Sequence, residues 1–116
     1  MHQVNKAPIL VGIVTRNRAK ILPKSIESAL SQWVASIKVA VIDDGSTDAT
    51  RETAQRFPTV EWITWRESRG YVAARNYWMT TAETDCFVGL DDDAWFVQGD
   101  EIGEALDTFG HKFRML

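Results

Sequence analysis

The chain has 116 residues, 45% of them hydrophobic and 25% charged, which is typical of one globular domain over residues 1–116. Its net charge of -3 argues against nonspecific binding to nucleic acid or to an anionic membrane, because either partner favours a basic surface. The single cysteine, Cys86, excludes an internal disulfide, and no stretch reaches the roughly 20 apolar residues of a membrane span. We therefore expect a cytoplasmic protein without a transmembrane segment.

The first half of the chain alternates apolar runs with a helical pattern. Residues 9–14 are continuously apolar, as in a strand buried on both faces of a parallel sheet. A helix follows, with Pro23 near its start and with Ile26, Ala29, Leu30 and Trp33 at helical spacing. Residues 37–42 then predict a second strand, which ends in an acidic turn.

The second half continues the alternation. We predict a short helix over residues 48–57, a third strand over residues 60–65 near a sheet edge, and a helix from Gly70 to about Ala82. A fourth strand covers residues 86–90. The last helix is marked by apolar residues at helical spacing, namely Ile102, Ala105, Leu106 and Phe109. This order predicts an α/β fold in which a mostly parallel sheet carries helices on both faces.

Three consecutive aspartates, Asp91, Asp92 and Asp93, directly follow the fourth strand. Adjacent carboxylates repel one another, so a folded protein keeps them at a strand end where a cation or hydrogen-bond donors offset their charge. In an open α/β sheet, ligands bind at the carboxyl ends of the strands. We therefore expect Mg²⁺ or Mn²⁺ and a phosphate group here, and the alternative is a solvated acidic turn that caps the next helix.

Two further loops bring polar side chains to the same edge of the predicted sheet. A basic cluster follows the first strand, formed by Arg16, Arg18, Lys20 and Lys24. Half of this cluster could meet a diphosphate, and a solvated loop is the alternative. Asp43 or Asp44 could accept a hydrogen bond from a base or ribose, and here the alternative is a helix cap. The chain lacks both the G-x-G-x-x-G turn of dinucleotide-binding dehydrogenases and the Walker phosphate loop of common ATPases and GTPases.

Four segments of the chain resemble, in order, the motifs of the inverting family 2 glycosyltransferases. They are T-R-N-R at residues 15–18, S-I-E-S-A-L-S-Q at residues 25–32, V-I-D-D-G-S-T-D at residues 41–48, and the stretch from Gly70 through Arg75 and Asn76 to the three aspartates. Their joint order and spacing cover nearly the whole chain. The resemblance implies the Rossmann-like GT-A fold of nucleotide-diphospho-sugar transferases, with this chain as an apparently truncated, N-terminal nucleotide-sugar-binding portion.

The resemblance further implies an enzyme that transfers a sugar from a nucleotide-sugar donor, usually a UDP-sugar, to an acceptor hydroxyl with inversion, using Mn²⁺ or Mg²⁺. The acceptor, a saccharide, a lipid carrier or a protein, stays open. The implied donor-binding residues are Thr15, Arg16, Arg18, Asp44, Gly70, Arg75, Asn76, Asp91 and Asp92, and the implied metal ligands are Asp93 and Asp91. Among these, Thr15 would lie near the uracil and Asp44 would bind a base nitrogen.

Two features depart from the family pattern. Arg16 stands where the family often has an aromatic residue, so base stacking would come from a guanidinium plane or from elsewhere. The family's general base is an acidic residue far beyond the aspartates, and we expect it beyond residue 116. We therefore expect that the chain binds nucleotide and metal but transfers sugar slowly or not at all. Its open side predicts a homo-oligomer formed through an exposed sheet edge.

Two interpretations from other classes of protein compete with the glycosyltransferase. A noncatalytic scaffold or binding module would be favoured if several of the five tryptophans formed one exposed patch. A receiver-type phosphoacceptor domain also uses clustered aspartates with Mg²⁺. Its acidic residues follow the first and third strands, however, whereas here they follow the second and fourth, which argues against a receiver.

Overall fold

The computed structural model describes residues 9–33 and 36–109, with side chains through residue 105. Strands and helices alternate along the chain as β1 (Ile9–Thr15), α1 (Leu22–Leu30), β2 (Ile37–Asp44), the 3-10 helix η1 (Ala49–Arg56), β3 (Glu61–Trp65), α2 (Tyr71–Thr81), β4 (Cys86–Asp91) and α3 (Glu101–Phe109). The four strands form one parallel sheet in the order β3-β2-β1-β4. The predicted α/β class with a parallel sheet is confirmed.

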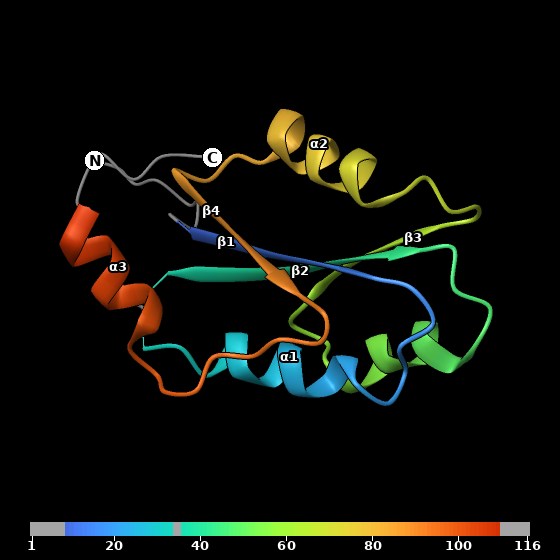
Figure 1. Ribbon diagram of the computed structural model, residues 1–116, viewed down its shortest axis with the longest axis horizontal. Helices are drawn as coiled ribbons and strands as arrows, with labels where there is room; N and C mark the ends of the chain where they lie inside the picture. The colour runs from blue at the N-terminus through green and yellow to red at the C-terminus, as the bar shows by residue number, and fades with distance from the viewer. Residues whose placement is uncertain (1–8, 34–35, 110–116) are drawn as a thin grey trace.

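Helices cover both faces of this sheet (Figure 1). On one face, α1 and α3 pack through Ile26 and Ile102 against a core that includes Ile13 and Val41. On the other face, α2 packs against the sheet through Ala74 and Trp78, together with Leu10, Ile42 and Phe87. Because β1 and β2 lie in the middle of the sheet and are covered on both sides, their sequences are nearly continuous apolar runs.

A glycine in β1 allows α2 to approach the sheet closely. A Cβ atom at Gly12 would lie 2.7 Å from the Trp78 ring and 2.8 Å from the Phe87 ring. These two aromatic rings are themselves in contact, with centroids 5.7 Å apart. The missing side chain therefore makes room for the aromatic layer between α2 and the strands.

One sequence prediction needs correction, and another is made more specific. Trp33 does not belong to the apolar face of α1, because the helix ends at Leu30 and the Trp33 side chain is 75% exposed. Its backbone N–H donates to the Gly99 carbonyl over 2.6 Å, and its ring lies against Gly99. The short helix after β2 is a 3-10 helix, capped by the Asp48 side chain, which accepts a hydrogen bond from Thr50 N. The Leu106 and Phe109 side chains lie outside the described residues.

In the described sheet, β3 and β4 each have one neighbouring strand, so both edges are open. This agrees with the predicted edge position of β3, and self-association through an edge stays a prediction. The five tryptophans do not form one exposed patch: Trp65 and Trp78 are buried, whereas Trp33 and Trp95 are exposed at the two ends of one pocket.

No helix in the described ranges combines the length and the apolar composition needed to cross a membrane.

Candidate functional site

The strand order reverses direction between β1 and β4, whose carboxyl ends lie side by side. The chain runs outward from β1 through β2 to β3, and then crosses over to place β4 on the opposite side of β1. At such a reversal, the loops that follow the two adjacent strands run to opposite faces of the sheet, and ligands of open α/β sheets bind between them. Thr15 ends β1 and Asp91 ends β4 at this point.

Side chains from these two strand ends contact one another. The buried Thr15 hydroxyl donates to Asp92 Oδ2 over 2.9 Å. Arg18 Nη1 lies 3.8 Å from Asp92 Oδ1 and 3.6 Å from Asp93 Oδ2. Three residues that sequence analysis proposed for donor binding, Thr15, Arg18 and Asp92, thus lie together with the proposed metal ligand Asp93. The alternative that the aspartates cap the next helix is wrong, because α3 begins only at Glu101.

The surroundings of Asp92 make its ionised form less favourable than that of an ordinary aspartate. Burial raises the pKa of Asp92 above its ordinary value. The hydrogen bond from Thr15 and the charge of Arg18 lower the pKa in part, whereas the neighbouring Asp93 and Asp91 raise it further. Binding of a cation beside Asp92 would therefore be favourable, because the cation would offset the free-energy cost of ionising this carboxyl group.

One face of α1 holds the chain that follows β4. The Ser25 hydroxyl donates to the Asp91 carbonyl over 3.0 Å, and the Ser28 hydroxyl accepts from Phe96 N over 3.0 Å. Gln32 donates to the Gln98 carbonyl over 2.8 Å and accepts from Ile102 N over 2.9 Å. Sequence reasoning did not assign these contacts, although the signal was present: Ser25 and Ser28 lie on one face of α1, and Gln32, just beyond the end of the helix, continues their spacing.

Asp44 anchors the loop between β3 and α2. Its Oδ1 accepts from Arg69 N over 2.6 Å, and its Oδ2 accepts from Ser68 Oγ over 2.8 Å and from Gly70 N over 3.0 Å. Burial raises the pKa of Asp44, but these hydrogen bonds and the charge of Arg16 outweigh burial, and the pKa lies below its ordinary value. Three of the roughly four lone pairs of the carboxylate are used, so it retains one for a ligand.

Two glycines complete this loop geometry. Gly45 has a φ of 76°, and a Cβ there would lie 2.6 Å from Ser68 N. Gly70 has a φ of 95° and precedes α2. Both backbone conformations favour glycine. The predicted site residue Gly70 is therefore placed by the structure as the residue that turns the chain into α2 while donating its N–H to Asp44.

Asp43 is fully buried beside Asp44. Its Oδ1 accepts from Ser46 N over 3.1 Å, which closes the turn after β2. Its Oδ2 is buried and has no hydrogen-bond partner within the described parts of the chain. A buried carboxylate oxygen without a donor is costly, so this atom would gain from a donor brought by a ligand or by water.

Asn17 joins the loop after β1 to the loop after β2. It adopts a φ of 55°, and its side-chain Oδ1 accepts from Thr47 N over 2.7 Å and from Asp48 N over 3.2 Å. Its backbone N–H donates to Ser46 Oγ over 2.9 Å. These bonds fix the backbone on which Arg18 is carried, and Arg18 N is itself bonded to Thr50 Oγ1 over 2.9 Å.

The remaining predicted site residues do not contact the aspartates. Arg16 is exposed and lies close enough to Asp44 to act on its charge. Arg75 and Asn76 are exposed on α2, where the guanidinium of Arg75 lies 5.9 Å from the centre of the Tyr71 ring. No hydrogen bond or ion pair in the described structure joins either residue to Asp92 or Asp93.

The donor set suits a hard divalent cation only in part. Within the described ranges, no group of three or more histidine, cysteine, aspartate or glutamate side chains is arranged to hold a metal ion. Mg²⁺ commonly binds through one or two carboxylates and completes its coordination with substrate phosphates and water. Asp93, which is exposed, and Asp91 fit such a site if a phosphate-bearing ligand supplies further oxygens.

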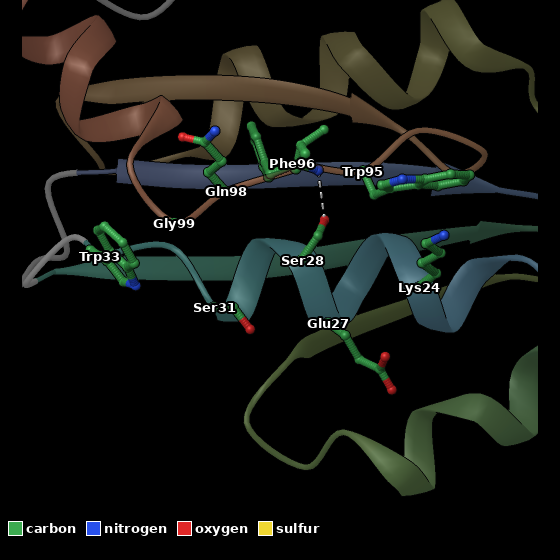
Figure 2. Close-up of a pocket in the computed structure, with 10 residues that line it drawn as sticks. Lys24, Glu27, Ser28, Ser31, Trp33, Trp95, Phe96, Gln98 and Gly99 are labelled. Atoms are coloured by element: carbon green, nitrogen blue, oxygen red, sulfur yellow. Dashed lines mark hydrogen bonds between the residues drawn. The ribbon is translucent and has the colours of Figure 1, made fainter.

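A separate pocket of about 400 Å³ lies between α1 and the segment after the aspartates (Figure 2). Lys24 and Trp95 lie at one end, with Lys24 Nζ 3.9 Å from the centre of the Trp95 ring, and Trp33 lies at the other end. None of the predicted site residues lines this pocket. It is therefore distinct from the cluster at the ends of β1 and β4.

Comparison with known proteins identifies the family. The sequence model described as glycosyl transferase family 2 matches residues 10–113. The chain belongs to glycosyl transferase family 2. The resemblance inferred from the four motifs is confirmed, and the family is one of enzymes.

Among curated family 2 relatives, the chain is 30% identical over 109 residues to the succinoglycan biosynthesis protein ExoU of Rhizobium meliloti, covering 90% of this chain and 31% of that protein. It is also 30% identical over 114 residues to the chondroitin synthase of Escherichia coli, covering 91% of this chain and 16% of that protein. The family 2 chain thus spans about a third or less of these two relatives.

Solved structures show the same fold. The mannosyltransferase PcManGT from Pyrobaculum calidifontis, solved with GDP-Man and Mn²⁺, matches with a TM-score of 0.78 and 24% identity, covering 90% of this chain and 33% of that chain. S. aureus TarS 1-349 with UDP-GlcNAc matches with a TM-score of 0.78 and 20% identity, covering 87% of this chain and 30% of that chain. The family 2 chain therefore has the GT-A fold.

Proposed function

We propose that the chain is the donor-binding portion of an inverting, metal-dependent glycosyltransferase that takes its sugar from a nucleoside diphosphate sugar, specifically a UDP-sugar. The main observation in support is the meeting of Thr15, Arg18, Asp92 and Asp93 at the reversal of strand order, in a member of a sugar-transferring family. Two neighbours of the same fold were solved with nucleotide sugars, one with UDP-GlcNAc and one with GDP-Man.

In this proposal, the nucleoside lies over the ends of β1 and β2. Thr15 lies near the base, and the fourth lone pair of the Asp44 carboxylate accepts a base N–H. The exposed guanidinium of Arg16 replaces an aromatic ring as a flat surface for the base. Arg75 and Asn76 contact the donor from α2. A base that presents an N–H to a carboxylate is thereby favoured, and uracil satisfies this requirement.

The diphosphate lies over the end of β4 in this arrangement. Asp93 and Asp91 hold Mn²⁺ or Mg²⁺ together with the phosphates, and Asp92, oriented by Thr15, binds the ribose or the sugar. When bound, the metal offsets the negative charge that develops on the departing nucleoside diphosphate. Arg18 supplies a second positive charge to the same group, since guanidinium matches phosphate oxygens well.

We assign no general base among the residues of this chain. An inverting transfer needs a carboxylate that takes the proton of the acceptor hydroxyl on the side of the sugar opposite the leaving group. In our assignment, the described carboxylates at the ends of β2 and β4 lie on the donor side. The acceptor, whether saccharide, lipid carrier or protein, is therefore recognised outside the site described above.

Thermal unfolding of the chain with UDP, GDP, ADP and CMP, each with and without Mn²⁺, tests the proposal. A ligand of the native state at a hundredfold excess over Kd stabilises it by about 2.7 kcal/mol. We expect the largest shift with UDP and Mn²⁺, and its loss in Asp93→Asn.

Asp85→Asn is the matched control, because it removes the same charge from an exposed residue at the opposite end of β4. This variant should keep the full shift. The proposal fails if no nucleotide raises the unfolding temperature, or if Asp93→Asn responds to UDP and Mn²⁺ as the unaltered chain does.

A further inference from the structure

Arg18 lies beside Asp93, which is one of the two proposed metal ligands, and beside its neighbour Asp92. A single nitrogen, Nη1, lies 3.8 Å from Asp92 Oδ1 and 3.6 Å from Asp93 Oδ2. Both distances exceed those of hydrogen bonds, so the attraction is one of charge without fixed geometry. The side chains of Arg18 and Asp93 are 42% and 56% exposed, and water therefore weakens the contact.

The backbone of Arg18 is held much more firmly than its charged end. Its N–H donates to the buried Thr50 hydroxyl over 2.9 Å, and the preceding residue, Asn17, is bonded to the loop after β2. Asp92 is likewise oriented by Thr15 through its other oxygen. The guanidinium can therefore move away from the aspartates without any rearrangement of the two loops.

We propose that Arg18 is a built-in counter-cation, which neutralises Asp92 and Asp93 while no donor is bound and moves to the diphosphate when a divalent cation binds. This inference rests on the proposed donor site and deepens it. Two cations cannot both approach the Asp93 carboxylate without repelling each other, so Arg18 and the metal compete for it. Thermodynamic linkage requires that the metal weakens the attraction between Arg18 and the aspartates by the same factor by which Arg18 weakens metal binding.

The nucleotide relieves this competition. A diphosphate brings anionic oxygens to which the guanidinium can turn, and guanidinium–phosphate contacts are stronger than a loose pairing at 3.6 Å. The metal therefore binds weakly to the donor-free protein and tightly when a nucleoside diphosphate is present. Arg18 thus makes metal binding conditional on the presence of the donor.

Arg18→Gln tests the inference, because it removes the charge and keeps the backbone hydrogen bond. Mn²⁺ binding is measured by electron paramagnetic resonance of the free ion, with and without UDP. Exposed ion pairs are individually weak, so without nucleotide we expect the variant to bind Mn²⁺ about three- to tenfold more tightly than the unaltered chain. UDP without metal should bind more weakly to the variant.

Lys20→Gln is the control, since it removes the same charge from the same loop, and no ion pair in the described structure joins Lys20 to the aspartates. It should change Mn²⁺ affinity by less than about twofold. If UDP and Mn²⁺ bind together but Arg18→Gln leaves Mn²⁺ affinity unchanged or lowers it, the inference is wrong and the donor site stands. If neither UDP nor Mn²⁺ binds any of the proteins, the proposed function and the inference both fail.

Discussion

Asp44 contributes to stability independently of any ligand, because its carboxylate holds three donors of the loop between β3 and α2. In Asp44→Asn, the NH2 group replaces one carboxylate oxygen and faces at least one N–H donor, so that hydrogen bond is lost. The negative charge that strengthens the remaining hydrogen bonds is lost as well. We expect the variant to lose about 2–4 kcal/mol of unfolding free energy at pH 7. Urea denaturation of both proteins measures this difference.

The difference should depend on pH. The pKa of Asp44 is lower in the folded chain than its ordinary value, so ionised Asp44 stabilises the fold above the unfolded pKa. This contribution disappears as the pH falls through the folded pKa, and the two proteins should then converge in stability. A difference that stays constant down to strongly acidic pH would show that the charge of Asp44 is not the cause.

Asp92 presents the opposite case, since burial raises its pKa and its ionised form is costly to the fold at neutral pH. Asp92→Asn removes that cost and retains an oxygen that can accept from Thr15. We expect an unfolding temperature at pH 7 equal to or above that of the unaltered chain, together with weaker binding of UDP and Mn²⁺. Differential scanning calorimetry and titration calorimetry would show the two effects separately, and a clear loss of stability would contradict this account of Asp92.

At the scale of elements, Gln32, two residues after the end of α1, connects that end of the helix to the segment that leads into α3. Its amide donates to the Gln98 carbonyl and accepts from Ile102 N, and both bonds are partly or fully buried. Gln32→Met keeps the volume but leaves these backbone groups without a partner. We expect a loss of about 2 kcal/mol of unfolding free energy in urea, with an unchanged m value. A loss below about 0.5 kcal/mol would mean that water replaces the side chain.

Gly45, in the turn between β2 and η1, is required both by its backbone angle and by a close contact, whereas Gly70, at the start of α2, is required by its backbone angle alone. An alanine at position 45 would place its Cβ 2.6 Å from Ser68 N, and its backbone would have to adopt a φ of 76°. At Gly70 the φ is 95° but nothing lies within 4 Å of the Cβ position. We expect Gly45→Ala to lose about 2–3 kcal/mol and Gly70→Ala about 1 kcal/mol, measured by urea denaturation. Equal losses would show that the contact with Ser68 relaxes at no cost.

The elements differ in how well their sequences predict them. The strand at residues 9–15 follows from an apolar run, because a covered parallel strand has no polar face. The strand at residues 86–91 also begins with an apolar run, although it lies at the sheet edge and is partly exposed toward its end. The end of α1 was placed too late, since Leu30 and Trp33 continue the helical spacing while Trp33 leaves the helix and contacts Gly99. The contacts of Gln32 depend on residues about 70 positions away, and helical periodicity contains no information about such partners.

For the molecule as a whole, the chain order of motifs predicts the sheet and the edge at which its polar loops meet. Sequence reasoning placed Thr15, Arg18 and the aspartates at one edge, and the structure brings them into contact. It did not predict that Asp44 is engaged by the loop after β3, because that contact requires knowing how the loop turns at Gly70. The donor roles of Arg75 and Asn76 stay predictions.

The measurement that tests the central claim most directly is an amide NMR spectrum of the chain with UDP and Mg²⁺, followed by replacement of Mg²⁺ with Mn²⁺. The paramagnetic ion broadens signals near its site. We predict that broadening centres on residues 15–18 and 91–93, and that Ile37 and Cys86, at the amino ends of their strands and about 20 Å away, are broadened far less. Broadening centred on the amino ends of the strands, or spectra unchanged by UDP and either metal, would contradict a donor site at the ends of β1 and β4.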